Sequence, residues 1–180
     1  MNFDVGNLCM LQRCNFALQN KLFNMLRKII TITLLLVIAA SCSKTTDAVD
    51  YSVTDKKIIE DYLLAHNLTA QSTTSGLYYI IKQPGGAYHA NIHSQVSALY
   101  KGYLVNDTVF DQSTLSYNNP ATFSLASVIK GWQIGIPLIG VGGKIKLLVP
   151  SALGYGSVAK TLIPANSVLI FDIEIVDIYN

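Results

Sequence analysis

Apolar and polar residues alternate along much of the chain after residue 75, and this period of two indicates β-strands with one buried face. Alternation predicts strands at residues 95–105, 144–149 and 168–178, and a run rich in Tyr and Ile predicts another at 76–82. In the strand at 144–149 the alternate face begins with Lys144 and Lys146. We therefore expect that face to be exposed to water at its start.

Turn residues separate these strands. Pro84-Gly85-Gly86 ends the strand at 76–82. Asn106 and Asp107 both tolerate positive φ and predict a hairpin, with a short returning strand at 108–110. A polar loop rich in Ser and Asn follows at 112–120.

A first helix is predicted from an apolar stripe that consists of Ile58, Ile59, Tyr62 and Leu63. We expect Thr54 to cap its start, Asp55 to lie in its first turn, and Asn67 to end it. The stripe packs either on the rest of the domain, which we favour, or against a second copy of the chain.

A second, shorter helix carries the only Trp of the chain. Val128, Ile129, Trp132 and Ile136 recur at helical spacing. Because Gly131, Gly135 and Pro137 oppose a long helix, we expect it to begin at a Ser127 cap and to end near Pro137. Against a curved sheet, the indole would form a concave aromatic floor, or it is an ordinary core residue.

Strands outnumber helices, which predicts an α+β fold: an antiparallel half-barrel sheet wrapped on one short helix, with an additional N-terminal helix after a leader. We assign residues 54–75 to that N-terminal helix and a linker, and residues 76–180 to the domain that contains the sheet.

The leader has the three parts of a secretory signal. Arg27 and Lys28 precede an apolar run at 29–40, which is shorter than the 20 or so residues that span a bilayer. Ala-Ala-Ser-Cys, ending at Cys42, resembles a bacterial lipobox and implies cleavage before a lipidated Cys42; the alternative is a plain signal peptide. We expect 25–41 to be the signal, 42–53 a tether, and 1–24 an over-called extension before Met25, or else part of a long leader.

Charge and cysteine content follow this division. The whole chain has a net charge of +2, but from Cys42 onward it holds nine Lys, no Arg and ten acidic residues, a net charge of −1. With no basic run, we expect no nucleic-acid partner. Cys9 and Cys14 lie in the leader, so we expect no disulfide framework.

The chain has no recognisable hydrolase elbow, phosphate-binding loop or metal cluster. His89 and His93 are four residues apart, but the nearby Pro and Gly residues oppose a helix, and no Cys or acidic residue accompanies them. We therefore expect no metal and no cofactor. Such a sequence suits a reaction that needs only a shaped apolar cavity.

Five segments resemble, in order, the FKBP family of peptidyl-prolyl isomerases. They are Y-K-G-Y-L-V-N-D-T-V-F-D from residue 100, V-I-K-G-W from 128, V-G-G-K-I-K-L-L-V-P from 141, G-Y-G from 154 and L-I-P-A-N-S-V-L-I-F-D-I-E-I from 162. The resemblance implies an FKBP-like fold and a groove that binds proline-containing polypeptides, with a macrolide as a possible ligand.

The resemblance also implies the site residues. Trp132 would be the floor under the proline ring, Tyr100, Phe110 and Phe171 the walls, and Asp111 the group that orients Tyr100. The Ile129 N–H and the Tyr155 hydroxyl would each donate to a substrate carbonyl. Further substrate contacts are implied for Val128, Phe123 and Ile163.

Some positions depart from the family pattern. Ala121 stands where family members usually carry a further aromatic wall, Leu99 replaces a frequent His, and Pro164-Ala165 replaces a double proline. These differences bear on substrate affinity, rate and macrolide binding more than on the fold.

We therefore expect a prolyl isomerase that assists the folding of exported proteins, anchored by lipid in the cell envelope and facing the periplasm or the cell surface. Two alternatives stay open: a non-catalytic chaperone that binds proline segments, and a structural envelope lipoprotein.

Overall fold

The structure is a computed structural model that describes residues 50–113 and 120–179. The expectations for the extension at 1–24, the signal at 25–41, most of the tether and Cys42 lie outside the described residues.

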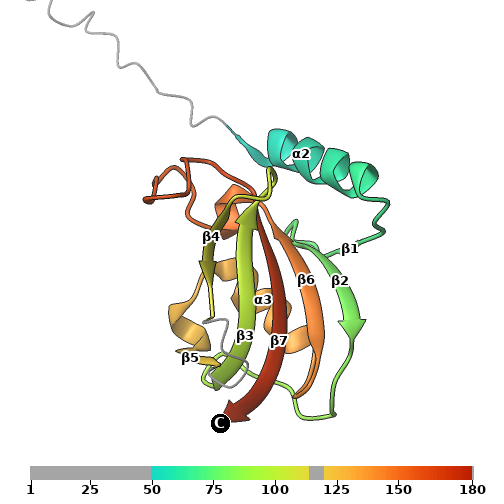
Figure 1. Cartoon of the computed structure of the whole chain (residues 1–180), viewed down its shortest axis with the longest axis vertical. Coiled ribbons are helices and arrows are strands. Elements are labelled where there is room, and N and C mark those ends of the chain that lie inside the picture. The colour runs from blue at the N-terminus through green and yellow to red at the C-terminus, as the bar shows by residue number, and fades with distance from the viewer. Residues whose placement is uncertain (1–49, 114–119, 180) are drawn as a thin grey trace, which may run out of the picture. The chain divides into compact units, whose positions relative to one another are not determined.

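A single antiparallel sheet forms the framework of the described part (Figure 1). Its strands run in the order β1-β2-β6-β7-β3-β4, and β5 also pairs with β3. Their bounds are β1 Gln71–Ser72, β2 Tyr78–Gln83, β3 Gln95–Leu104, β4 Val109–Gln112, β5 Ala121–Ser124, β6 Lys144–Val149 and β7 Leu169–Tyr179. The antiparallel α+β fold predicted from the alternation is confirmed, whereas the short β1 and β5 were not predicted.

The short helix α3, Lys130–Gly135, covers one face of this sheet and lies behind β3 and β7 in Figure 1. Glycine allows the close approach: a Cβ at Gly131 would lie 2.6 Å from Val149, and one at Gly135 would lie 2.6 Å from Leu147. Ile136–Leu138 continues as a 3-10 turn, so the predicted end near Pro137 is right.

The expected cap at Ser127 is wrong. Ser127 ends a separate 3-10 turn, Leu125–Ser127, and α3 begins after Ile129 with no side-chain cap. The reason is that Val128 and Ile129 are both extended, which separates the Ser127 hydroxyl from the helix. The Gln133 side-chain amide instead donates to the carbonyls of Ala126 and Val128.

Helix α2, Ser52–Ala65, packs on the opposite face of the sheet near its end. Its buried Ile59, Tyr62 and Leu63 contact Tyr103, Leu148, Val168 and Ile170. The stripe therefore packs on the domain, as favoured from the sequence.

The two ends of α2 differ in how well the sequence predicted them. The helix begins at Ser52 rather than Thr54, because the Asp50 carboxylate accepts the Ser52 N–H at 2.9 Å. At the other end Asn67 has φ of 51°, and the Leu68 N–H donates to the Leu63 carbonyl at 2.9 Å. This is a Schellman ending, so the predicted stop at Asn67 is confirmed.

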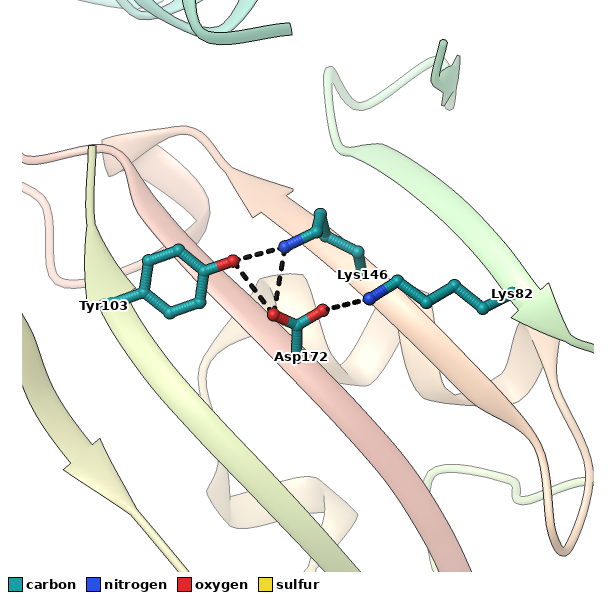
Figure 2. A network of polar contacts seen from close by, with 4 residues as sticks. All are labelled: Lys82, Tyr103, Lys146 and Asp172. Carbon is teal, nitrogen blue, oxygen red and sulfur yellow. Dashed lines mark hydrogen bonds and ion pairs between the residues drawn. The ribbon is translucent and has the colours of Figure 1, made fainter. Parts of the chain in front are cut away.

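The expectation that the Lys144 and Lys146 face of β6 is exposed to water is wrong at Lys146, which is only 7% exposed. Its ammonium donates to Asp172 on β7 at 3.0 Å and contacts the Tyr103 hydroxyl on β3 (Figure 2). Asp172 lies directly opposite Lys146 in the strand register and also accepts from Lys82 on β2 at 2.7 Å. These four side chains, the Asp172 network, link β2, β6, β7 and β3.

None of the helices in the described ranges is long and apolar enough to cross a membrane.

Candidate active site

A pocket of about 220 Å³ opens between α3, β3, β4, β7 and the loop after β6. It is lined by Tyr100, Phe110, Asp111, Phe123, Ser127, Val128, Ile129, Trp132, Tyr155 and Phe171. The structure thus brings together nine of the site residues expected from the sequence, from segments more than 70 residues apart.

Edge-to-face aromatic contacts surround the floor of this pocket. Trp132 is only 4% exposed, and its ring centroid lies 5.2 Å from that of Tyr100 and 5.4 Å from those of Phe123 and Phe171. Phe110 meets Phe171 in the same way at 5.5 Å. Such pairs are favourable beyond the area they bury, so the rings hold one another in place.

Strand register explains why the walls meet. Gly102 of β3 lies opposite Phe171 of β7 and opposite Asp111 of β4. A Cβ at Gly102 would lie 2.7 Å from Phe110 and 2.8 Å from Phe171, so the two rings lie over bare backbone. The sequence analysis did not single out Gly102; a glycine inside an alternating strand was the available signal.

The polar part of the pocket is a hydrogen bond from the Tyr100 hydroxyl to Asp111 Oδ2 at 2.8 Å. Burial raises the pKa of Tyr100, and the hydrogen bond and charge of Asp111 raise it further. Burial, together with the charge of Asp111, also raises the pKa of Tyr155. Both phenols therefore remain neutral hydrogen-bond donors at physiological pH.

The start of α3 adds a backbone donor. The Ile129 carbonyl accepts the N–H groups of Trp132 and Gln133, which fixes this corner. Among the described residues no acceptor is found for the N–H of Ile129 itself. The pocket therefore combines apolar rings with a few donors at its edge, which suits a polypeptide carbonyl group beside a small apolar ring.

Two residues differ from expectation. Ser127 lines the pocket and was missed, since only its capping role was considered. Ile163 is absent from the lining: it is 6% exposed and packs in the main core, while its neighbour Leu162 is 52% exposed. The backbone pairing of Ile163 with Lys160 turns the loop, which directs the Ile163 side chain inward.

Within the described ranges no group of three or more His, Cys, Asp or Glu side chains could hold a metal ion. His89 Nδ1 instead lies 2.9 Å from the Pro137 carbonyl oxygen.

Residues 86–176 match the family of FKBP-type peptidyl-prolyl cis-trans isomerases. The chain is 50% identical over 109 residues to the FKBP-type peptidyl-prolyl cis-trans isomerase FkpA of Buchnera aphidicola subsp. Schizaphis graminum. That alignment covers 60% of this chain and 43% of the relative, so the chain spans less than half of that relative's length.

The crystal structure of FkpA from Escherichia coli is similar with a TM-score of 0.63 at 28% identity, over 99% of this chain and 84% of that one. The crystal structure of AtFKBP13 is similar with a TM-score of 0.54 at 36% identity, over 61% of this chain and 98% of that one.

Proposed function

This chain belongs to the FKBP-type peptidyl-prolyl cis-trans isomerases, and we propose that it catalyses cis–trans isomerisation of X-Pro bonds in exported polypeptides. The observation that carries this proposal is the pocket itself: an indole floor with aromatic walls, edged by hydrogen-bond donors.

The chemistry follows from the amide bond. An X-Pro amide rotates slowly because its C–N bond has partial double-bond character. In the twisted transition state this resonance is lost, so the amide is less charge-separated than when it is planar. An apolar pocket therefore disfavours the planar amide more than the twisted one, and that difference lowers the barrier.

We assign the residues of the pocket as follows. The proline ring rests on Trp132 between Phe110 and Phe171. The Ile129 N–H and the Tyr155 hydroxyl donate to carbonyl groups of the substrate. These donors hold the chain on either side of the bond that rotates, so that only this bond turns.

Asp111 and Tyr100 form the polar wall. The 2.8 Å hydrogen bond holds the Tyr100 ring edge-on to Trp132, which supports an orienting role for Asp111. Phe123 and Val128 complete the wall, whereas the burial of Ile163 supports a role in the core rather than in substrate contact.

The test is a proline-peptide isomerisation assay on the full chain in mild detergent. We expect a rate above the uncatalysed background, and a loss of about tenfold or more in kcat/KM for Asp111→Ala and for Phe171→Leu. Leu largely preserves apolar volume, so the variant should fold. Glu174→Gln on the opposite face is the control and should leave kcat/KM unchanged.

Three other results would change the assignment. If the wild type is active and neither pocket variant alters kcat/KM, the site is elsewhere. Suppression of client aggregation without isomerisation identifies a binding chaperone, for which the missing aromatic wall at Ala121 would be the reason. If the protein shows neither isomerisation nor suppression of aggregation, the structural envelope protein is the interpretation that remains.

We propose further that Cys42 is lipidated after removal of residues 25–41, which holds the domain in the cell envelope facing the periplasm or cell surface. The support is the basic, apolar and Ala-Ala-Ser-Cys order of the leader. Mass spectrometry of protein from bacterial membranes should find an acylated N-terminal Cys42; a free amine at any other residue contradicts this.

A macrolide is proposed as a ligand of the same pocket. Ala121 stands where family members usually carry a further aromatic wall, so the pocket has one ring fewer to contact a macrolide. We therefore expect a macrolide to inhibit the isomerase only weakly. The same peptide assay measures it.

A further inference from the structure

One lysine lies at the edge of the pocket without a carboxylate partner. The ammonium of Lys160 is 5.5 Å from the ring centroid of Tyr155, and Tyr155 lines the pocket. Among the described residues Lys160 makes no ion pair. In contrast, Lys144 and Lys146 each pair with a carboxylate.

The backbone holds this lysine in place. The Lys160 N–H donates to the Ile163 carbonyl at 2.8 Å, and the Ile163 N–H donates to the Lys160 carbonyl at 3.1 Å. Because the Ile163 side chain is buried in the core, this two-bond turn is anchored to the sheet. The cation is therefore carried by a fixed loop, although its own side chain is exposed.

Other charges near the pocket are few. Asp111 lines the pocket and accepts from the Tyr100 hydroxyl. Lys130 follows Ile129, and its ammonium donates to the Gln133 side chain at 3.2 Å. The segment 114–119 contains no charged residue in its sequence. Among the described residues, Lys160 is thus the cation at this edge that has neither a carboxylate partner nor a side chain that accepts a hydrogen bond from its ammonium.

We propose that Lys160 is a specificity-determining residue, and that this isomerase prefers prolines flanked by an acidic residue. The inference rests on the proposed function, because it places the substrate chain across the pocket. A carboxylate next to the proline would be repelled by Asp111 inside the pocket and attracted by Lys160 at its edge. The repulsion opposes the attraction, so an acidic side chain is favoured only where it lies nearer to Lys160 than to Asp111.

The expected size of the preference follows from Coulomb's law for exposed charges. At separations of several ångströms in a water-rich environment, the attraction corresponds to about a two- to fivefold preference at low ionic strength. Because salt screens exposed charges, the preference should fall toward one at about 1 M salt.

The experiment compares matched peptides that differ only by Glu or Gln, placed either directly before or directly after the proline. It measures kcat/KM for each peptide and, separately, the dissociation constant from the fluorescence of Trp132, the only Trp in the chain. The proteins are the wild type, Lys160→Gln and the control Lys101→Gln. Lys101 is a good control because it resembles Lys160 in two respects. Its ammonium also lies over a tyrosine ring, 5.4 Å from the centroid of Tyr103, and it also makes no ion pair among the described residues.

We expect the wild type and Lys101→Gln to prefer Glu over Gln about two- to fivefold at one of the two positions, and Lys160→Gln to show a ratio near one. A ratio near one in the wild type at both positions, or a preference that survives in Lys160→Gln, overturns the inference. If no peptide is isomerised, the proposed function fails, and the ratio of dissociation constants still decides the role of Lys160.

Discussion

At the scale of single residues, the absence of a side chain shapes the pocket as much as the rings do. Phe110 and Phe171 both lie over Gly102, and each would be within 3 Å of a Cβ placed there. Phe171 also packs edge-on against Trp132, and the open space beside both rings is the pocket itself. The identity of residue 102 therefore sets the position of both walls.

Gly102→Ala should displace these rings and narrow the pocket. We expect kcat/KM to fall about tenfold, since sub-ångström to ångström displacements in a site reduce rates strongly. The matched control is Gly86→Ala, whose added methyl would lie 3.6 Å from the Val141 carbonyl oxygen, an ordinary contact, and which should leave kcat/KM unchanged. A Gly102→Ala enzyme with wild-type kcat/KM in the peptide assay would show that the walls are not limiting.

The two pocket phenols lead to a prediction for pH. Burial raises the pKa of both Tyr100 and Tyr155, so each hydroxyl keeps its proton to a higher pH than a free tyrosine does. We therefore expect kcat/KM to stay level from neutral pH up to about pH 10, the ordinary value for tyrosine. A decline centred well below that pH, measured in a pH series, would mean that another group controls the rate.

At the scale of elements, one carboxylate attaches α2 to the segment that leads to the pocket. Asp55 is 1% exposed, and its Oδ2 accepts both the N–H and the hydroxyl of Ser151, at 2.8 and 2.7 Å. Ser151 begins the 3-10 turn Ser151–Leu153, which is followed by Tyr155. The position of α2 is therefore tied to that of a pocket residue.

Removing this carboxylate should destabilise the domain. Asp55→Ala leaves two buried donors of Ser151 without an acceptor, which costs about 2–4 kcal/mol. Ser151→Ala removes only one hydrogen bond and should cost about 1 kcal/mol. Asp61→Ala is the control on the same helix, because Asp61 forms an exposed pair with Lys57 that contributes little. Urea unfolding measures all three, and equal effects for Asp55 and Asp61 would contradict the prediction.

At the scale of the whole described domain, the Asp172 network joins four strands on the face of the sheet opposite α3 (Figure 2). Burial alone would raise the pKa of Asp172, but hydrogen bonds from Lys82, Lys146 and Tyr103 outweigh it and hold the pKa below its ordinary value. The ionised form is therefore favoured in the folded state, and its contribution to stability is present above about pH 4 and lost as the pH falls below that.

Asp172→Asn should accordingly lower the free energy of unfolding by about 2 kcal/mol at neutral pH, because the Lys146 ammonium stays buried without its counter-charge. The difference from the wild type should shrink below about pH 4, where the wild-type carboxylate takes up a proton. Glu174→Gln, which breaks the more exposed pair with Lys144, should have a smaller effect. A gap between Asp172→Asn and the wild type that is independent of pH in urea unfolding would rule out this electrostatic origin.

The sequence by itself determined the local features of this protein. Alternation located the long strands, Gly and Pro limited α3 to a short helix, and Asn67 and Asp107 marked chain reversals where φ is positive. These signals depend on a residue and its near neighbours. Local patterns did not predict the pocket, because the helical spacing around Trp132 also fits an ordinary core residue. The pocket residues were predicted from the ordered segments that resemble the family.

Only the tertiary structure decided which distant residues meet. Lys146 is buried because strand register places Asp172 opposite it, and Asp55 is more than a first-turn acid because it meets a serine 96 residues later. Ile163 faces the core because its backbone pairs with that of Lys160, which reverses the loop. These outcomes depend on register and packing between elements, and the residue patterns within a single element carry no information on them.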